Sequence, residues 1–325
     1  MPGLIVDPQQ GHIDVAQSNF ARKYRNPGLL AELLFSRITV MEQTGKFWQF
    51  GRQNQQVPDN PLRAPGAAAE QVKQTISTNS YRAEDYSLAR LITQEERANF
   101  QAGNVDQWAT EMLTDRILLD LENRIANLMG LAATYPSGNK VVLSGTDQWK
   151  DAGAVDGTTS NPIDDVMAGH VKISEIGVKA NTLFLGVDTW RGLKTHADIK
   201  GRVSPTKFGA VSTEDMAAIF EVERVLVGIP VKVTLNPDGT VASVARLWDA
   251  KNAILAYVNP GASFEDVSFG KLFVWAAPGT SGGFGTVIGP APWPSRQADE
   301  LSVHFYYDPK ITSDISAYFI ENAVA

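Results

Sequence analysis

The sequence contains no cysteine and only four histidines among its 325 residues. Without cysteine there are no disulfide bonds and no thiolate metal sites, and a reducing compartment is the natural setting. Long apolar runs are also missing, since no window approaches the roughly 18 to 20 residues that span a membrane. The first eight residues lack both a basic region and an apolar run, so we predict no secretory signal.

Basic residues are in the minority, and the net charge is −7. A chain with this balance is not expected to work mainly by gripping phosphate backbones. The hydrophobic share of 43% is ordinary for a globular protein, so a sizeable core is expected.

Enzyme motifs are absent or stand in the wrong context. The phosphate-binding pattern G-x-x-x-x-G-K-[ST] does not occur. At the strand–helix junction of residues 185–192, the bulky Trp190 would block the close approach of a pyrophosphate. Ser281 lies in a G-x-S-x-G pattern, but residues 284–290 do not begin the helix that a nucleophile elbow requires.

Metal and acid–base sites are equally unsupported. The histidines show no ligand spacing to one another or to carboxylates; they are His12, His170, His196 and His304. Asp164 and Asp165 are better explained as carboxylates that favour a helix N-terminus than as a catalytic pair. We therefore expect a protein that is not an enzyme, with no catalytic, cofactor-binding or metal-binding residue.

The strongest local pattern predicts a long helix over residues 105–133, capped by Asn104 with Gln107 as its capping-box partner. Its apolar residues form two stripes, which indicates packing on two sides. The first stripe is Trp108, Met112, Leu119 and Ala126, and the second is Leu113, Ile117, Leu121, Ile125 and Leu128. Arg116, Asp120 and Arg124 form an i,i+4 ladder on the exposed part.

Shorter elements surround this helix. Helix starts are predicted at Asn26-Pro27, Asn161-Pro162, Asp188 and the Ser212/Asp215 capping box. Strands are predicted at 37–50, 140–143, 182–185, 225–227, 254–258, 272–275, 301–307 and 317–320, with a hairpin at 231–244. The glycine- and proline-rich residues 278–294 are predicted to be loop.

Two segments have no place in such a core. Residues 1–25 are Gln-rich and aperiodic, like an arm. Residues 51–80 contain three prolines, no aromatic residue and no periodicity, although packed-looking sequence flanks them. Structureless loops beyond roughly 12 to 15 residues are uncommon in a compact domain and are usually functional or disordered. An arm and a loop that cannot pack on their own domain suggest packing on a neighbouring subunit.

The order and character of several segments resemble a tailed-bacteriophage major capsid protein of the Hong Kong 97-like fold. Residues 86–92 resemble the strand returning from that family's extended loop, and residues 105–133 resemble its spine helix. Residues 181–203, 212–228 and 247–260 resemble successive parts of its axial domain, and residues 316–324 resemble its closing strand.

The resemblance implies an α+β fold with five parts. These are an N-terminal arm and short helix (1–36), an extended loop (37–92, tip about 51–80), a peripheral domain with the spine helix (93–160), an axial domain (161–299), and C-terminal strands that return to the peripheral domain (300–325). With about 25 residues before the first helix, we expect no cleaved scaffolding segment. That leaves scaffolding by a separate protein, or none.

The resemblance also implies a function: a structural subunit that self-assembles into hexamers and pentamers of an icosahedral virion capsid around double-stranded DNA. Assembly would take place in the host cytoplasm, and the acidic balance would keep the packed DNA from sticking. Scaffolding, portal and decoration proteins are further partners to consider, and no membrane is expected. The charged loop residues are candidates for inter-subunit contacts: Arg52, Arg63, Glu70 and Lys73. Lys73 is the loop's only lysine, and nothing in the sequence supports its crosslinking.

Two alternatives stay open. An encapsulin-type cellular compartment would use the same fold. An α/β enzyme is suggested by the strand–helix alternation between residues 161 and 228, but it lacks a phosphate loop and a nucleophile context.

Overall fold

The computed structural model describes residues 21, 28–52, 57, 62–63, 65–66, 77–100, 103–149, 160–203, 211–261, 263–276 and 284–325. The predicted arm, most of the loop tip and Ser281 lie outside these residues.

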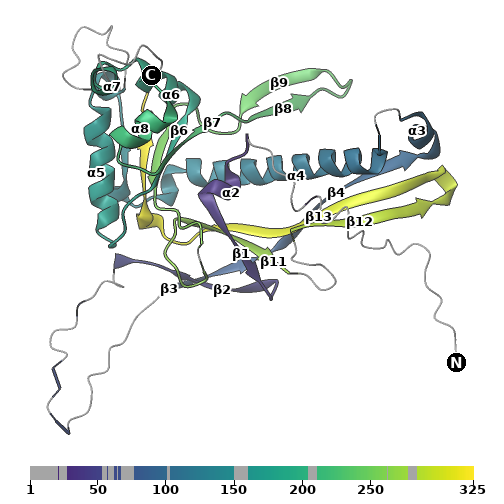
Figure 1. The fold of residues 1–325 in the computed structure, drawn as a ribbon, viewed down its shortest axis with the longest axis horizontal. Coiled ribbons are helices and arrows are strands. Elements are labelled where there is room, and N and C mark those ends of the chain that lie inside the picture. The colour runs from purple at the N-terminus through teal and green to yellow at the C-terminus, as the bar shows by residue number, and fades with distance from the viewer. Residues whose placement is uncertain are drawn as a thin grey trace.

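A long helix, α4, runs along a strongly elongated sheet (Figure 1). Its sheet has the order β1-β11-β13-β12, and β4 pairs with β13 as well. Residues 301, 303, 305 and 307 of β13 are buried against α4, while the alternate residues lie on the other face. The elements of this layer are β1 (Phe35–Val40), β4 (Glu84–Thr93), α3 (Gln94–Asn99), α4 (Val105–Gly130), β11 (Gly270–Trp275), β12 (Phe284–Trp293) and β13 (Ala298–Ile311).

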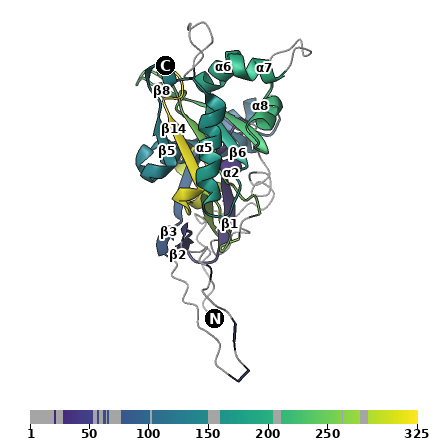
Figure 2. The same cartoon turned by 90° about the vertical axis from the view of Figure 1, so that its left-hand side faces the viewer.

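A second sheet stands at the C-terminal end of α4, with helices on its outer face (Figures 1 and 2). Its order is β5-β14-β10-β6-β7. In β6, Leu183 and Leu185 pack under the helices, whereas Phe184 packs toward α4, so both faces are buried. The elements are β5 (Lys140–Val142), α5 (Pro162–Ser174), β6 (Thr182–Gly186), α6 (Val187–Thr195), α7 (Ala197–Val203), α8 (Thr213–Ile219), β7 (Arg224–Gly228), β10 (Ala253–Ala256) and β14 (Ala317–Glu321).

Two hairpins and several short helical turns complete the fold. One hairpin is β2 (Thr44–Gln49) with β3 (Ser77–Arg82), and the other is β8 (Val231–Leu235) with β9 (Val241–Arg246). The turns are α2 (Ala31–Leu34) and the 3-10 segments Ala132–Thr134, Ser137–Asn139, Gly145–Asp147, Pro294–Arg296 and Asp314–Ser316.

A buried carboxylate joins these parts. Glu122 of α4 is fully buried and accepts hydrogen bonds from the backbone amides of Leu30 and Ala31 at 2.9 and 2.6 Å. It also accepts one from the Trp248 indole at 2.6 Å. The start of α2 and the segment after β9 are therefore both fixed to the middle of the long helix. No sequence pattern points to Glu122, because its partners are about a hundred positions away in the chain.

Most predicted elements are present, and the predicted caps at Asn104, Asn161 and Ser212 are confirmed. Several details were wrong. The long helix ends at Gly130, not at residue 133, and Asn104 caps it by accepting from the amide of Asp106. Asp188 lies inside α6, whose N-cap is Gly186. The predicted helix start at Asn26-Pro27 lies outside the described residues, and the short helix α2 begins at Ala31.

The largest error concerns residues 278–294, because residues 284–293 form β12 and not loop. This strand lies at the edge of its sheet, where proline costs no ladder hydrogen bond, and register shifts absorb its glycines and prolines. Likewise residues 77–80, assigned to the loop tip, pair with β2.

The strand pairing also divides the chain differently from the predicted domain boundaries. β11 and β12, placed in the axial segment 161–299, pair with β13 beside α4. β14, expected to return to the peripheral domain, lies between β10 and β5 in the second sheet. The places of β14 and β11 arise from pairing between distant segments that no local pattern encodes, whereas β12 pairs with the strand that follows it in the chain.

Candidate assembly surfaces

The root of the extended loop is held firmly to the body. At the end of β2, the amide of Phe50 donates to Thr312 O at 3.2 Å, and the Ser313 hydroxyl donates to Phe50 O at 3.1 Å. The ammonium of Lys271 lies 5.4 Å from the centre of the Phe50 ring. The loop therefore leaves the body from a fixed position at this end.

Lys271 is unusual because it is almost completely buried in β11. Its ammonium donates to the carbonyls of Ser263 and Phe264 at 3.0 and 3.1 Å. Burial lowers the pKa of Lys271 to about 8, and nearby Asp266 opposes that shift. This lysine thus ties the turn of residues 263–266 to the loop root.

The four predicted contact residues have different positions. Arg52 forms an ion pair at 2.6 Å with Glu175, at the end of α5 in its own subunit. Arg63 is exposed. Glu70 and Lys73 lie outside the described residues. The two described candidates, Arg52 and Arg63, do not contact each other. Arg52 lies at the loop root, and Arg63 lies in the loop itself.

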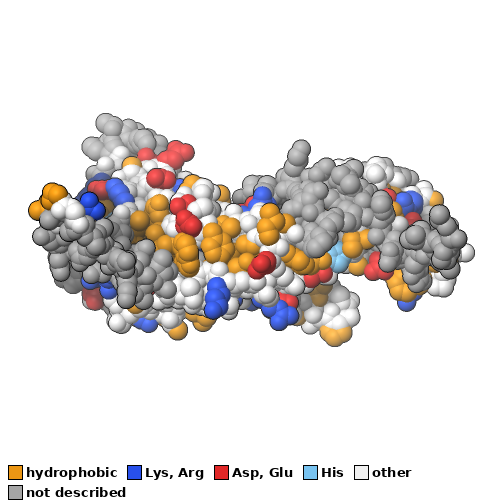
Figure 3. Space-filling model, turned by 90° about the horizontal axis from the view of Figure 1, so that it is seen from below, with side chains coloured by type: hydrophobic (Ala, Val, Ile, Leu, Met, Phe, Trp, Pro, Cys, Tyr) orange, Lys and Arg blue, Asp and Glu red, His pale blue; other side chains and the backbone are white. Residues whose placement is uncertain are grey.

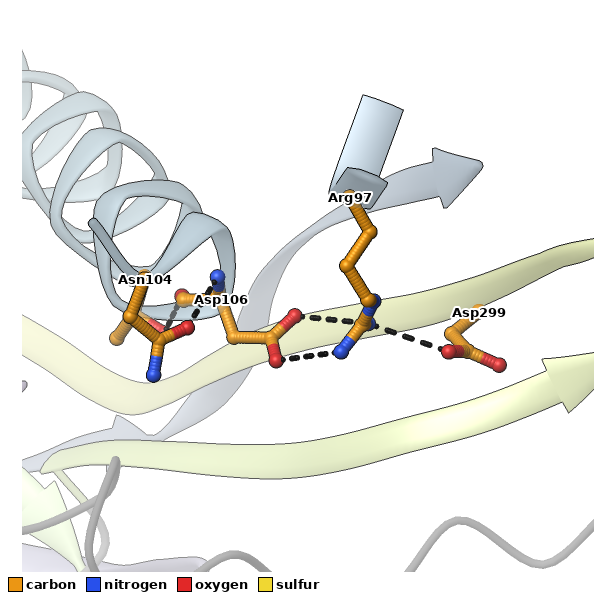
Figure 4. A network of polar contacts seen from close by, with 5 residues as sticks. Arg97, Asn104, Asp106 and Asp299 are labelled. Carbon is orange, nitrogen blue, oxygen red and sulfur yellow. Dashed lines mark hydrogen bonds and ion pairs between the residues drawn. The ribbon is translucent and has the colours of Figure 1, made fainter. Parts of the chain in front are cut away.

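The N-terminal end of α4 is fastened by a small polar network (Figure 4). The Arg97 guanidinium donates to both oxygens of Asp106 at 2.9 and 3.0 Å and to Asp299 at 3.2 Å. This network joins α3, the first turn of α4 and β13. The network therefore fastens the neighbouring helices α3 and α4 to the distant strand β13 in one stiff tip.

Trp108 lies beside this tip, and its environment differs from the prediction that it belongs to an apolar packing stripe of the helix. It is 42% exposed instead of buried. The Arg90 guanidinium lies 4.4 Å from its ring centre, and the Phe100 ring is 5.8 Å away. An exposed, rigidly stacked indole of this kind is a suitable contact point for another protein.

Seen from below, apolar side chains gather in a band along the middle of the molecule (Figure 3).

On β13, His304 Nε2 lies 3.1 Å from Ser302 Oγ, and its Nδ1 lies 3.0 Å from Asp85 of β4. The alignment resembles a hydrolytic triad, but Ser302 is paired on both sides, with Ile288 and Ala89. The ladder occupies the local backbone, so an oxyanion hole has no donor there. We interpret these residues as a cross-strand contact.

The sequence predicts no phosphate site at the start of α6, and the structure supplies a further reason. The amides of Asp188 and Thr189, which would meet a phosphate, donate to Ala250 O at 3.0 and 3.1 Å. A side chain at Gly186 would collide with the same backbone, 2.3 Å from Ala250 O. The segment after β9 therefore fills the place that a nucleotide takes in α/β enzymes.

The described residues lack two features, a metal-ligand cluster and a membrane-spanning helix. They contain no group of three or more histidine, aspartate or glutamate side chains arranged to hold a metal ion. They also contain no helix that is both long and apolar enough to cross a membrane.

No protein-family profile matches the chain. Two curated relatives do, and both are named major capsid protein. That of Pseudomonas phage JBD67 is 27% identical over 320 residues, covering 96% of this chain and 97% of the relative. That of Burkholderia phage BcepMu is 25% identical over 247 residues, covering 76% of each chain.

A phage-related protein from Bordetella bronchiseptica has a crystal structure similar to this one, with a TM-score of 0.77 at 22% identity. The match covers 97% of this chain and 99% of that one. The chain has the Hong Kong 97-like capsid fold. The capsid protein of a native GTA particle matches at a TM-score of 0.58 over 99% of this chain.

These relatives confirm the predicted resemblance, fold and structural capsid function. The encapsulin alternative is less supported: an encapsulin from Synechococcus elongatus shares the fold at a TM-score of 0.53 but only 13% identity. Both curated relatives carry the name of a structural phage protein.

Proposed function

We propose that this capsid protein forms hexamers and pentamers of an icosahedral shell around double-stranded DNA. The observation that carries the proposal is the extended loop. It leaves a firmly anchored root, and its apolar residues Val57 and Leu62 are 80% and 85% exposed on their own subunit. Contact with the next subunit around a ring would bury them, and rings of such heterologous contacts close into capsomers.

Within this proposal, Arg63, Glu70 and Lys73 contact the neighbouring subunit, while Arg52 sets the loop root through Glu175. Exposed pairs of this kind are each worth about 0 to 1 kcal/mol. Repetition around each capsomer makes their sum significant.

The proposed domains are those implied by the resemblance, with β14 moved to the axial part and β11 and β12 to the peripheral part. The packaged DNA is contacted without sequence preference, in keeping with the net charge of −7. Assembly takes place in the host cytoplasm, with scaffolding, portal and decoration proteins as candidate partners.

Sedimentation velocity and negative-stain microscopy of the purified protein test the proposal. We expect capsomers and closed shells in the MDa range, alone or with a co-expressed scaffold. A stable, monodisperse monomer at micromolar concentration under both conditions would overturn it.

A further inference from the structure

The β8–β9 hairpin stands free of the rest of the subunit. All residues of both strands are exposed. Figure 1 shows the hairpin extending above α4 and away from the second sheet. An isolated two-stranded hairpin is marginally stable at best in water, so a hairpin of this kind benefits from a partner.

One face of this hairpin is entirely aliphatic at its centre. Val231, Val233 and Leu235 alternate along β8, and Val244 and Val241 oppose the latter two from β9. Their exposed fractions lie between 43% and 61%. The other face carries the polar or small residues Lys232, Thr234, Ser243 and Ala245. We call the five aliphatic residues the hairpin face.

The hairpin is closed by its own turn at the tip and anchored to the body at its base. At its tip, Asn236 N donates to Thr240 O at 2.8 Å, and the Thr240 amide donates to Asp238 at 2.9 Å. At its base, Leu247 N donates to Pro230 O at 3.1 Å, and the next residue, Trp248, is bonded to Glu122 in the core. A surface fixed in this way loses little conformational entropy on binding.

We propose that the hairpin face docks on a second copy of this chain, the neighbouring subunit of the same shell. The inference rests on the proposed shell function and adds a contact separate from the extended loop. Five half-exposed aliphatic side chains offer roughly a few hundred Å², less than the roughly 800 Å² per partner of a standard interface. The hairpin face therefore strengthens an assembly that other contacts also hold, and it does not make a stable dimer alone.

Charge favours a copy of this chain as the occupant. The hairpin segment 229–247 carries two basic side chains, Lys232 and Arg246, against the single acid Asp238. The whole chain carries a net charge of −7. Arg246 stands opposite Val231 at the base of the aliphatic face, whereas Lys232 lies on the other face. The net positive charge of the hairpin is thus attracted to a neighbour that is acidic overall.

The absence of cysteine makes a direct test possible. Val244→Cys places a single thiol in the hairpin face, and Thr234→Cys places one on the opposite face of the same hairpin. The rate of reaction with a thiol reagent is measured on free subunits and on shells. We expect assembly to slow labelling of the Val244→Cys variant by about tenfold, equivalent to about 1.4 kcal/mol, and that of the Thr234→Cys variant by less than about twofold.

A second variant reads out assembly itself. Val233→Thr with Val244→Thr keeps the β-branched shape but makes the face polar, and Thr234→Ser with Ala245→Ser is the matched control. We expect the first pair alone to raise the concentration needed for shells, by about tenfold. Circular dichroism of the subunit is expected to be unchanged in both.

The outcomes separate the two proposals. Equal labelling of the Val244→Cys variant in shells and free subunits would overturn the docking inference and leave the shell function standing. Failure of the unsubstituted protein to form any shell would overturn the proposed function, and the docking inference with it.

Discussion

At the scale of single residues, two buried charges organise this protein: Glu122 and Lys271. Burial raises the pKa of Glu122, and the hydrogen bonds from Trp248, Ala31 and Leu30 oppose that shift. Both carboxylate oxygens of Glu122 accept hydrogen bonds. Each of its oxygens faces donors that have no other described partner.

Glu122→Gln is expected to destabilise the isolated subunit by about 1 to 3 kcal/mol, because the new amide group points a donor at a buried donor. Urea unfolding followed by circular dichroism measures the change. Glu111→Gln, a less buried position on the same helix, is the control and should stay within about 0.5 kcal/mol of the unsubstituted protein. Equal effects at both positions would mean that Glu122 is not the joint between the layers.

Lys271 gives a pH dependence of defined sign. Its pKa is about 8 in the folded state, against an ordinary value of 10.5. Between these values the unfolded chain binds the proton and the folded chain does not, so stability rises with pH. The gain disappears below about pH 8, where both states are protonated.

We therefore expect the free energy of unfolding of the unsubstituted subunit, relative to Lys271→Met, to increase by about 1 to 3 kcal/mol from pH 7.5 to pH 10. Lys46→Met, an exposed position on β2, should show no such trend. Urea titrations at three pH values measure both differences. A difference in unfolding free energy between the unsubstituted protein and Lys271→Met that stays constant with pH would contradict the assigned burial of the charge.

At the scale of elements, α4 is the part best predicted from the sequence. Helical periodicity is a local property, and the second stripe is buried as predicted from Leu113 to Ile125. The first stripe was only partly right, because Trp108 stacks on Arg90 at a tip that distant residues build. Residues 284–293 were missed since an edge strand tolerates prolines that would break a central one.

Leu121→Ala tests the role of α4 as a core element. Leu121 is 1% exposed, so the substitution is expected to cost about 2 to 5 kcal/mol. Leu131→Ala, just beyond the helix and well exposed, should change stability by less than about 0.5 kcal/mol. Thermal and urea unfolding of the subunit provide the comparison, and a negligible cost at Leu121 would disprove two-sided packing of the helix.

At the scale of the whole molecule, the two surfaces that we propose for assembly contribute little to the fold. The extended loop and the hairpin face both place aliphatic side chains in solvent on their own subunit. Such residues are costly to leave exposed, and association removes them from water at about 25 cal/mol per Å².

Replacing residues 54–76 by a short Gly-Ser linker is expected to leave a soluble subunit with native circular dichroism that forms no closed shells. The loop closure cost grows only slowly with length, so the fold tolerates the change. A Gly-Ser linker of the original length is the control that separates reach from side-chain contacts, and it should also fail to assemble. Sedimentation and microscopy decide the matter, and normal shells from both variants would show that the loop is a passive insertion.

The sequence by itself determined the longer helices, most strands, the lack of an enzyme motif and the presence of a long polar segment without periodicity. All of these depend on residue spacing within a few turns of chain. Tertiary structure alone decided the joint at Glu122, the burial of Lys271, the strand status of residues 284–293 and the place of β14 in the second sheet. The partners of Glu122 and β14 lie far away in the chain, and a local pattern carries no information about them. The strand that pairs with β12 and the carbonyls that bind Lys271 lie nearby in sequence, but only the folded backbone brings them into contact.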